Sequence, residues 1–450
     1  MSMQRRTFLS LLTVPAIAAL LPACGDDAAS DDSTSTGDTS GPGTTTSGHA
    51  ATASLRGEAP HVTTGADPTA ASAAINAFAA DLFDRLVAVD PVANLVFSPA
   101  SIALALAMTS AGAKGTTLTE MDAVLHITDP ATIHRSMNGL ATSLTALNQS
   151  QDNTAQGGTG VSEVQLSIAN SLWAQRGLAF EQAFLDLLSA EYDAGLELVD
   201  YKADPEAARV AINAWVAEET RDRIPELLGQ GTITPTTRLT LVNAIYLKAN
   251  WAQIFDEQRT SEQLFTAPGG DVTVDMMRVD GRFQVAVTDE WAAIDLPYVF
   301  NGLSLTVLVP GAGFAGPQPS GDEVFAALQP APVMLSFPRF DIETSVSLAD
   351  VLGELGMATA FSDQADFSGM TTAEPLTIGD VIHQANITVD EEGTEAAAAT
   401  AVVMEATGMP DPQEPIELVV DRPFTFWLRD RNTGTIVFMG RVNDPSATRG

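Results

Sequence analysis

Cysteine is almost absent from this chain: Cys24 is the only one among 450 residues. A single thiol cannot form an intramolecular disulfide, and it cannot supply a metal site built from several thiolates. Histidine is scarce as well, with five in the chain and none in an HExxH pattern. Zinc is therefore not indicated. We expect neither a metal nor any other cofactor.

Positive charge is also scarce. The chain has 22 Lys and Arg against 57 Asp and Glu, which gives a formal net charge of −35. A surface with this balance repels phosphate groups, so nucleic acids and anionic lipid surfaces are poor partners. The charge fits a soluble protein outside the cytoplasm, although it carries no information about the fold.

Motifs of catalysis are missing too. The sequence has neither a GxSxG elbow nor a Walker loop. Residues 311–316 match GxGxxG, but a dinucleotide site requires a helix to begin there, and Pro310, Pro317 and Pro319 crowd the segment. We interpret it as a surface loop. No motif argues for an enzyme, and a hydrolase lacks any nucleophile–base signature.

The N-terminus has the features of an export signal. Arg5 and Arg6 precede an apolar run from Leu11 to Leu21, which is too short to span a bilayer comfortably. Ala23 and Cys24 end this run and resemble a bacterial lipobox. The pattern predicts a twin-arginine-like signal peptide over residues 1–23 and a diacylglycerol thioether on Cys24. The alternative is an ordinary secretory peptide in which the cysteine is incidental.

A low-complexity segment follows. From Asp26 to about Asp67 the chain is mostly Ser, Thr, Gly, Ala and Asp, with almost no large apolar residue. Such a segment cannot bury enough surface to offset its conformational entropy. We expect residues 24–67 to be a lipidated, disordered tether that holds a domain of residues 68–450 near a membrane.

The globular part contains both helical and strand patterns. Apolar residues recur with a helical period from Ala70 to Val89, and a nearly all-apolar run from Ser101 to Ser110 predicts a buried helix capped by Ser98. Strand-like runs are numerous and occur at 164–172, 239–247, 283–287, 303–309, 333–337, 382–389, 424–428 and 435–439. The pattern predicts an α+β domain with large mixed or antiparallel sheets.

One stretch, residues 390–404, can be interpreted in two ways. Its alanines and glutamates favour a short surface helix or an Ala-rich linker. By strand alternation, one face carries only small or β-branched residues, namely Thr394, Ala396, Ala398, Thr400 and Val402. Such a face fits a tight slot in a sheet without overpacking, and no proline interrupts residues 390–409.

At this point the residues resemble the serpin family over essentially the whole globular part. Residues 94–102 are similar to the family pattern N-x-x-F-S-P-x-S-I, and residues 241–251 resemble the strand that ends at the family's breach tryptophan. Further segments match in the same order: 111–117, 212–216, 366–371, 382–385, 421–424 and 438–445. The order and spacing of these segments, together with residues 390–404, carry the resemblance.

The resemblance implies a serpin fold, with three β-sheets, about eight to nine helices and an exposed reactive-centre loop. It implies inhibition by insertion of that loop into the main sheet as a new strand after a protease attacks it. The matching hinge residues are Glu391, Gly393, Thr394, Ala396, Ala398 and Thr400. The matching breach and shutter residues are Trp251, Arg339, Asn94, Ser98, Ser101, Asn243 and His383.

Several details remain open at this level. The Glu391–Arg339 pair matches a salt bridge at the opening point of the sheet, but a surface pair worth under about 1 kcal/mol is the alternative. His383 is a candidate for a buried hydrogen-bond partner rather than a catalytic base, because no nucleophile accompanies it.

Family spacing puts the reactive bond between Thr407 and Gly408, although cleavage one or two residues away, or after Met404, is also open. No Lys or Arg lies between Glu391 and Ile416. We therefore expect a serine protease partner with a small or apolar primary pocket, of the elastase, chymotrypsin or subtilisin type. A cysteine protease is the alternative target. The alternative function is that of a non-inhibitory binding protein of the cell envelope. We expect a monomer.

Overall fold

The structure is a computed structural model that describes residues 53–63, 65–153, 161–313, 318–394 and 414–447. Expectations for the signal peptide, Cys24 and residues 26–52, and for Ala396, Ala398, Thr400, Val402, Thr407 and Gly408, lie outside these ranges. Within them, no helix has the length and apolar character needed to cross a membrane.

An eight-stranded sheet forms one half of the domain, with the order β1-β5-β4-β6-β14-β13-β12 and β3 paired to β4. Its strands are β1 (Ala53–Leu55), β3 (Gln149–Asp152), β4 (Val161–Gln175), β5 (Leu196–Val199), β6 (Leu239–Asn250), β12 (Phe340–Ser347), β13 (Val381–Val389) and β14 (Gly393–Thr394). The predicted strands at 164–172, 239–247 and 382–389 are β4, β6 and β13.

A nine-stranded sheet forms the other half, with the order β15-β11-β8-β9-β10-β16-β17-β2 and β7 paired to β8. Its strands are β2 (Leu95–Phe97), β7 (Ser261–Ala267), β8 (Gly270–Val287), β9 (Trp291–Pro297), β10 (Leu303–Pro310), β11 (Gln329–Pro338), β15 (Ile416–Val419), β16 (Phe424–Asp430) and β17 (Ile436–Val442). We expected three sheets. Because β8 is long enough to pair with β7, β11 and β9, hydrogen bonding joins the described strands into two sheets.

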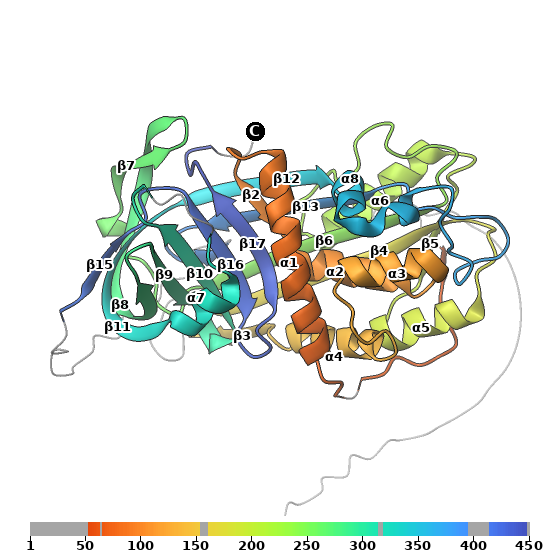
Figure 1. Cartoon of the computed structure of the whole chain (residues 1–450), viewed down its shortest axis with the longest axis horizontal. Helices are drawn as coiled ribbons and strands as arrows, with labels where there is room; N and C mark the ends of the chain where they lie inside the picture. The colour runs from red at the N-terminus through yellow and green to blue at the C-terminus, as the bar shows by residue number, and fades with distance from the viewer. Residues whose placement is uncertain (1–52, 64, 154–160, 314–317, 395–413, 448–450) are drawn as a thin grey trace, which may run out of the picture. The chain divides into compact units, whose positions relative to one another are not determined.

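The described residues contain eight α-helices, in agreement with the expected number. They are α1 (Thr69–Val89), α2 (Pro99–Ser110), α3 (Gly115–Val124), α4 (Ile133–Thr145), α5 (Gln182–Tyr192), α6 (Pro205–Glu219), α7 (Gly321–Ala327) and α8 (Ala349–Leu352). As predicted, Ser98 caps α2 and all its residues are buried. In Figure 1, α1 lies beside β17, with the nine-stranded sheet on one side and α2–α5 on the other. The α+β class is confirmed.

Strand β6 is covered on both faces. Leu241 and Ile245 belong to the main core that includes α2, whereas Val242 and Ala244 pack in a second core beneath α6. Successive side chains of a strand point to opposite faces, so the two helices cover opposite sides of this sheet.

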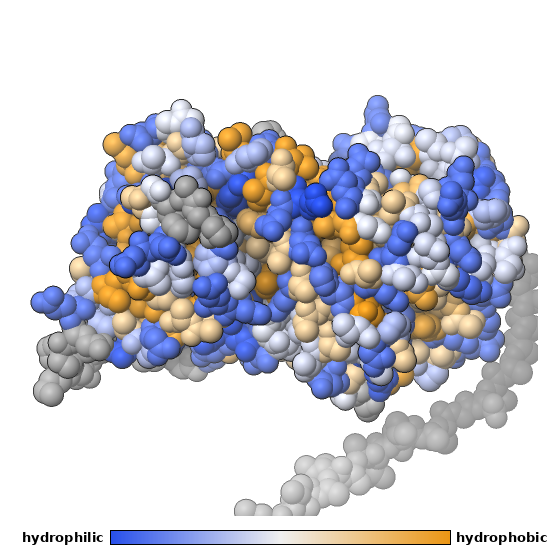
Figure 2. All heavy atoms as spheres, viewed as in Figure 1, coloured by the Kyte–Doolittle hydropathy of each residue, from blue (hydrophilic) through white to orange (hydrophobic). Residues whose placement is uncertain are grey.

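The molecular surface is mostly hydrophilic on the face that Figure 2 shows, with apolar residues between the hydrophilic ones.

The structure corrects the expected boundary of the tether. Residues 53–63 and 65–67, which we assigned to a disordered segment, are docked on the domain, and β1 pairs with the edge strand β5. The composition argument considered only the burial of side chains. This segment docks mainly through its backbone, and backbone N–H and C=O groups of any sequence can add to a sheet edge.

Candidate functional site

The hinge begins with a tight turn that follows β13. Asp390 organises this turn, because its Oδ1 accepts hydrogen bonds from the backbone N–H groups of Glu392 (2.9 Å) and Gly393 (3.1 Å). The turn is also held from outside. The indole and backbone N–H groups of Trp251 donate to the carbonyl oxygens of Asp390 and Glu392, each at 2.9 Å. Burial raises the pKa of Asp390, although the two backbone hydrogen bonds oppose this shift.

The two hinge residues after this turn already form a strand inside the sheet. Gly393 and Thr394 (β14) lie between β13 and β6 and pair antiparallel with both. Gly393 is needed for this close approach, because a Cβ atom there would overlap with the carbonyl oxygen of Ala249. Thr394 is buried and its Oγ1 lies 2.6 Å from the hydroxyl of Tyr298, whose ring stacks on Trp251 at 4.4 Å.

The predicted pair of Glu391 and Arg339 is present, and it is not a surface pair. Only 3 % of the Glu391 side chain is exposed. Its carboxylate accepts from Arg339 Nε at 2.6 Å and from the hydroxyl of Thr260 at 2.5 Å. Burial lowers the pKa of Arg339, but the hydrogen bond and charge of Glu391 outweigh burial, and the net shift is upward. The carboxylate is therefore satisfied by two partners from separate segments of the chain.

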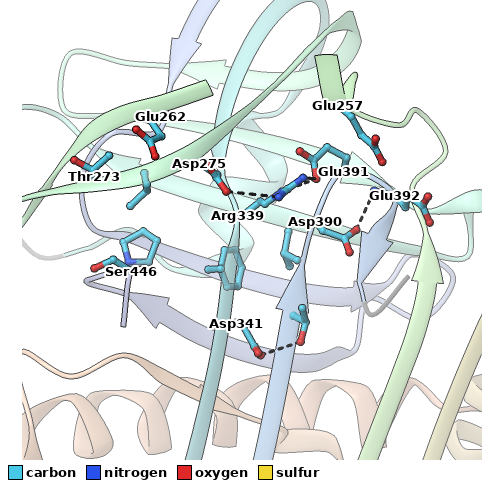
Figure 3. A pocket seen from close by; sticks show the side chains of 15 residues that line it. Glu257, Glu262, Thr273, Asp275, Arg339, Asp341, Asp390, Glu391, Glu392 and Ser446 are labelled. Atoms are coloured by element: carbon cyan, nitrogen blue, oxygen red, sulfur yellow. Dashed lines mark hydrogen bonds and ion pairs between the residues drawn. The ribbon is translucent and has the colours of Figure 1, made fainter. Parts of the chain in front are cut away.

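A cavity of about 750 Å³ opens next to this ion pair. Figure 3 shows Arg339 between the carboxylates of Asp275 and Glu391, with further acidic side chains around it. Those further acidic lining residues are Glu257, Glu262, Asp341, Asp390 and Glu392. The upper end of the sheet thus combines a charged cavity wall with a buried turn.

The shutter residues meet at the lower end of the same two strands. His383 on β13 is fully buried, its Nδ1 lies 2.8 Å from Asn243 Oδ1 on β6, and its Nε2 accepts from the backbone N–H of Ser98 at 3.1 Å. The imidazole is therefore neutral, with the proton on Nδ1. Burial lowers its pKa to about 3. Asn243 in turn donates to Ser101 Oγ and to Asn170 Oδ1, each at 2.5 Å.

Asn94 belongs to a different part of the molecule. Its side-chain oxygen accepts from the backbone N–H groups of Asn443 (2.8 Å) and Asp444 (2.9 Å), and its amide donates to the carbonyl of Asp444 at 2.7 Å. It fixes the C-terminal segment behind β17 and is not part of the His383 network. The resemblance grouped it with the breach and shutter residues, whereas its hydrogen-bond partners lie in the C-terminal segment.

Between these two ends, β6 and β13 separate. They pair in parallel from Val381 opposite Leu241 to Gln384 opposite Ala244, and in the described residues their ladder stops there. Five residues further up each strand, at Val389 and Ala249, Thr394 of β14 lies between them. The site is therefore a slot in the sheet that is closed at the bottom by direct pairing and filled at the top by two hinge residues.

Sequence reasoning missed three partners of this site: Tyr298, Thr260 and Asn170. Tyr298 follows β9 and Thr260 precedes β7, far from the hinge in sequence, and neither has a motif of its own. Asn170 lies inside the predicted strand at 164–172, where a polar residue in a mostly buried strand was a usable signal.

Comparison with known proteins decides the family. The family model described as serpin (serine protease inhibitor) matches residues 73–445. The chain belongs to the serpin family. An uncharacterised serpin-like protein of Thermococcus kodakarensis is 36% identical over 378 residues, covering 83% of this chain and 85% of that protein. The leukocyte elastase inhibitor of Bos taurus is 35% identical over 390 residues, covering 83% of this serpin and 99% of the relative.

Solved structures agree with this assignment. A cleaved serpin, named Serpin 42Da, superposes with a TM-score of 0.72 at 31% identity and covers 84% of this chain and 99% of its own. The native state of the thermophilic serpin tengpin gives a TM-score of 0.73 at 25% identity, covering 87% of this chain and 97% of its own. This serpin is therefore grouped with a family made up mostly of protease inhibitors and not of enzymes.

Proposed function

We propose that this serpin inhibits a serine protease with a small or apolar primary pocket, by inserting the residues after Thr394 into the slot between β6 and β13. The observation that carries the proposal is β14 itself. It is a strand already in place at the top of the slot, antiparallel to both neighbours. Strand growth from an existing nucleus needs no new register, because each added residue continues two existing ladders.

Continuing the observed register predicts where each residue would lie. Thr394 is opposite Val389 on β13 and Ala249 on β6, so a residue six positions later falls opposite His383 and Asn243. That residue is Thr400, whose hydroxyl can both donate and accept. Insertion would thus replace the direct contact between His383 and Asn243 without leaving either polar group unsatisfied in the core. Ala396 and Ala398 would occupy the stretch above, where small side chains avoid overpacking.

The proposed reactive bond remains Thr407–Gly408, within a loop that has no Lys or Arg between Glu391 and Ile416. A trypsin-like pocket requires a basic residue before the bond, so an elastase-, chymotrypsin- or subtilisin-like enzyme is the proposed partner. Inhibition also requires that the acyl-enzyme survive while the loop inserts. The small, proline-free segment from Asp390 to Met409 supports rapid insertion.

The decisive experiment mixes the full-length protein with elastase or with subtilisin and separates the products under denaturing conditions. We expect a covalent complex that resists SDS, and sequencing of the released fragment locates the bond. Ala398→Arg should convert the inhibitor into a substrate, because a charged side chain cannot enter the slot. Thr236→Arg, at an exposed loop position, is the matched control and should inhibit normally. Cleavage without any complex, or inhibition retained by Ala398→Arg, would refute the insertion mechanism.

A second function, a binding protein of the cell envelope, also has support. The structure of thyroxine-binding globulin in complex with thyroxine resembles this chain with a TM-score of 0.71 at 28% identity. Heating before and after cleavage of the loop separates the two functions. Insertion should raise the unfolding temperature strongly, because the cut loop completes the sheet, whereas a binding protein that does not insert should show no gain.

We also propose that Cys24 carries a lipid that anchors the exported protein to the cell envelope. The support is the Ala23–Cys24 pair after the apolar run and the absence of any other cysteine from the sequence. Mass spectrometry of the protein from a bacterial membrane fraction should detect the acylated N-terminal cysteine. Cys24→Ser should release the protein into the soluble fraction, and an unchanged membrane association in this variant would argue against the anchor.

A further inference from the structure

Residues 53–63 and 65–67 form a segment that we call the N-terminal strap. It lies ahead of residue 73, where the family match begins, so its role is not supplied by the family domain. It begins as β1 on the outer edge of the eight-stranded sheet, where Ala53 pairs with Leu198 and Leu55 with Leu196. It ends at α1, whose first residue is Thr69.

The first half of the strap is bonded to α5. The backbone N–H of Gly57 donates to Ser189 Oγ at 2.8 Å, and that of Glu58 donates to Asp186 Oδ1 at 2.7 Å. The N–H of Val62 donates to the carbonyl oxygen of Ala190 at 2.9 Å. These bonds use the strap's backbone, so they hold a segment that has few apolar side chains to bury.

The second half is bonded to α4 and α1. The side-chain amide of Asn138 donates to the carbonyl of Val62 at 3.0 Å. Ser136 is buried, donates from its hydroxyl to the carbonyl of Asp67 at 2.7 Å, and accepts from the N–H of Ala71 at 3.0 Å. One serine thus ties the end of the strap to both α4 and the first turn of α1.

Three glycines allow the strap to approach this closely. A Cβ atom at Gly57 would overlap with the backbone of Leu185, and one at Gly139 on α4 would overlap with the carbonyl oxygen of Ala66. At Gly195, just before β5, a Cβ atom would lie 2.8 Å from the carbonyl oxygen of Leu55. Glycines therefore occur both in the strap and in the elements beneath it, at the points where their backbones come into close contact.

The strap joins structural elements on the two sides of the slot. At its start it pairs with β5, which pairs with β4, and β4 pairs with β6 on one side of the slot. At its end it continues into α1, which packs on β17. Strand β17 pairs with β2, and β2 contacts both β12 and β13 on the other side. Opening the slot by moving β5, β4 and β6 away from β13 must stretch or detach the strap.

We propose that the N-terminal strap is a latch that holds the slot closed and so slows entry of the uncut loop. This inference rests on the proposed insertion mechanism. Loss of several backbone hydrogen bonds at the strap should destabilise the closed form more than the opened form, which has already lost them. Releasing the strap should therefore accelerate spontaneous conversion of the uncut protein to an inactive form by about tenfold or more.

The test uses full-length protein with single substitutions. Gly57→Ala introduces the Cβ overlap on the strap, and Gly139→Ala introduces it on α4. Gly65→Ala is the matched control, because a Cβ atom at this strap position meets nothing within 4 Å. Gly139→Ala has a further advantage. Alanine is the better helix former by about 1 kcal/mol, so without a latch this change should stabilise the protein.

Each variant is characterised by three measurements. Limited trypsin digestion at Arg56, read by mass spectrometry, reports whether the strap is detached. Incubation of the uncut protein reports the rate at which inhibitory activity is lost. Hydrogen exchange of backbone amides in residues 381–384, where β13 pairs directly with β6, reports opening of the slot without any protease. We expect Gly57→Ala and Gly139→Ala to expose Arg56, lose activity about tenfold faster and exchange faster, and Gly65→Ala to match the unmodified protein.

The latch would be refuted if Arg56 became cleavable while activity loss and exchange stayed unchanged. It would also be refuted if Arg56 stayed protected in both glycine variants, since the close packing would then be unimportant. If the unmodified protein forms no covalent complex with any protease, the inhibitory function fails separately, and the exchange measurement still decides whether the strap restrains the slot.

Discussion

The two ends of the slot between β6 and β13 are built from different chemistry. At the upper end, β14 lies between the strands, and a charged pair of Glu391 and Arg339 borders an open cavity. At the lower end the strands pair directly, and the neutral side chains of His383 and Asn243 bond to each other out of contact with water. The side chain of Arg339 is half-exposed, so water can solvate its charge when the upper end opens, whereas breaking a buried neutral network leaves unsatisfied polar atoms.

If the slot opens as we propose, this difference indicates the order in which its two ends open. The upper end can admit further residues because water replaces the lost partners there. The lower end resists until an incoming side chain offers equivalent hydrogen bonds. Under the proposed mechanism, a strand that grows downward from Thr394 would meet its largest barrier at the His383 network, and that network would control insertion.

Lowering the pH should have opposite effects on the stability contributed by the lower and the upper end of the slot. Burial lowers the pKa of His383 from 6.5 to about 3, so as the pH falls the unfolded chain binds the proton first. The stability that comes from neutral His383 is fully present above about pH 6.5 and is lost between pH 6.5 and about 3. Each unit of pKa difference corresponds to about 1.4 kcal/mol, so this is the largest effect we expect.

At the upper end, burial raises the pKa of Asp390 above 3.8, so acid favours the folded form there. Urea unfolding at pH 7 and pH 4.5, for the unmodified protein and for His383→Gln, tests the contrast. The variant should lose less stability on acidification, because it lacks the titrating group. His134, whose pKa burial lowers to about 4, titrates in the same direction in both proteins and so cancels in the comparison. An identical loss in the two proteins would contradict the assignment to His383.

Asn243→Ala should be the most destabilising of the substitutions that we compare at pH 7. It removes the acceptor for His383 Nδ1 and the donor to Ser101 and Asn170, all in the buried core. We expect a loss of about 2–4 kcal/mol in the free energy of unfolding, measured by urea titration. Asn432→Ala, at an exposed turn, is the control and should change stability by less than about 0.5 kcal/mol. Equal effects at the two positions would show that the lower network is not a stability element.

Glu391→Gln should have a smaller effect at the upper end. The change keeps the shape of the side chain but removes the charge opposite Arg339, and we expect a loss of about 1–3 kcal/mol. Asp275→Asn affects the same arginine from a half-exposed position at 3.6 Å and should cost under about 1 kcal/mol. Urea titration of both variants, with 1 M salt as a second condition, measures the contrast. A larger loss of stability for Asp275→Asn would mean that burial of Glu391 does not explain the contribution of the Glu391–Arg339 pair to the free energy of unfolding.

Tyr298→Phe should give the smallest effect. It removes one hydroxyl contact with Thr394 while the ring remains stacked on Trp251, so we expect a loss of about 1 kcal/mol. A double-mutant cycle with Thr394→Val should show a coupling of about 0.5–1.5 kcal/mol. A coupling near zero would indicate that β14 is held by its backbone ladders alone.

Much of the fold could be predicted from local patterns. Helix α1, the buried helix α2 with its Ser98 cap, and strands β4, β6 and β13 all follow from periodicity and from capping residues. Strands β1, β3, β5 and β7 could not be predicted. They are short or largely exposed, and their position depends on a neighbouring edge rather than on their own side chains. Helix α6 ends at Glu219, and the positive φ angles of Arg221 and Asp222 just beyond it are incompatible with a continued helix.

The site was predicted in part. The resemblance named Glu391, Arg339, Trp251, Ser98, Ser101, Asn243 and His383, and the structure brings each of them to one of the two ends of the slot. It also named Asn94, which instead binds the C-terminal segment. Thr260, Tyr298 and Asn170 complete the hydrogen bonds of the two ends and have no local signature, because each is over 70 residues from the hinge or shutter partner that it contacts.

By itself, the amino-acid sequence determined the α+β class, the family, the small-residue face at 394–402 and the lack of a basic residue in the loop, because each of these depends on residue identity and spacing along the chain. Only the tertiary structure decided that β6 and β13 separate above Ala244, that β14 already fills the top of the gap, and that a polar N-terminal segment is strapped across both sides. These features depend on the relative register of distant strands and on backbone hydrogen bonds, neither of which is written in the side chains of a single segment.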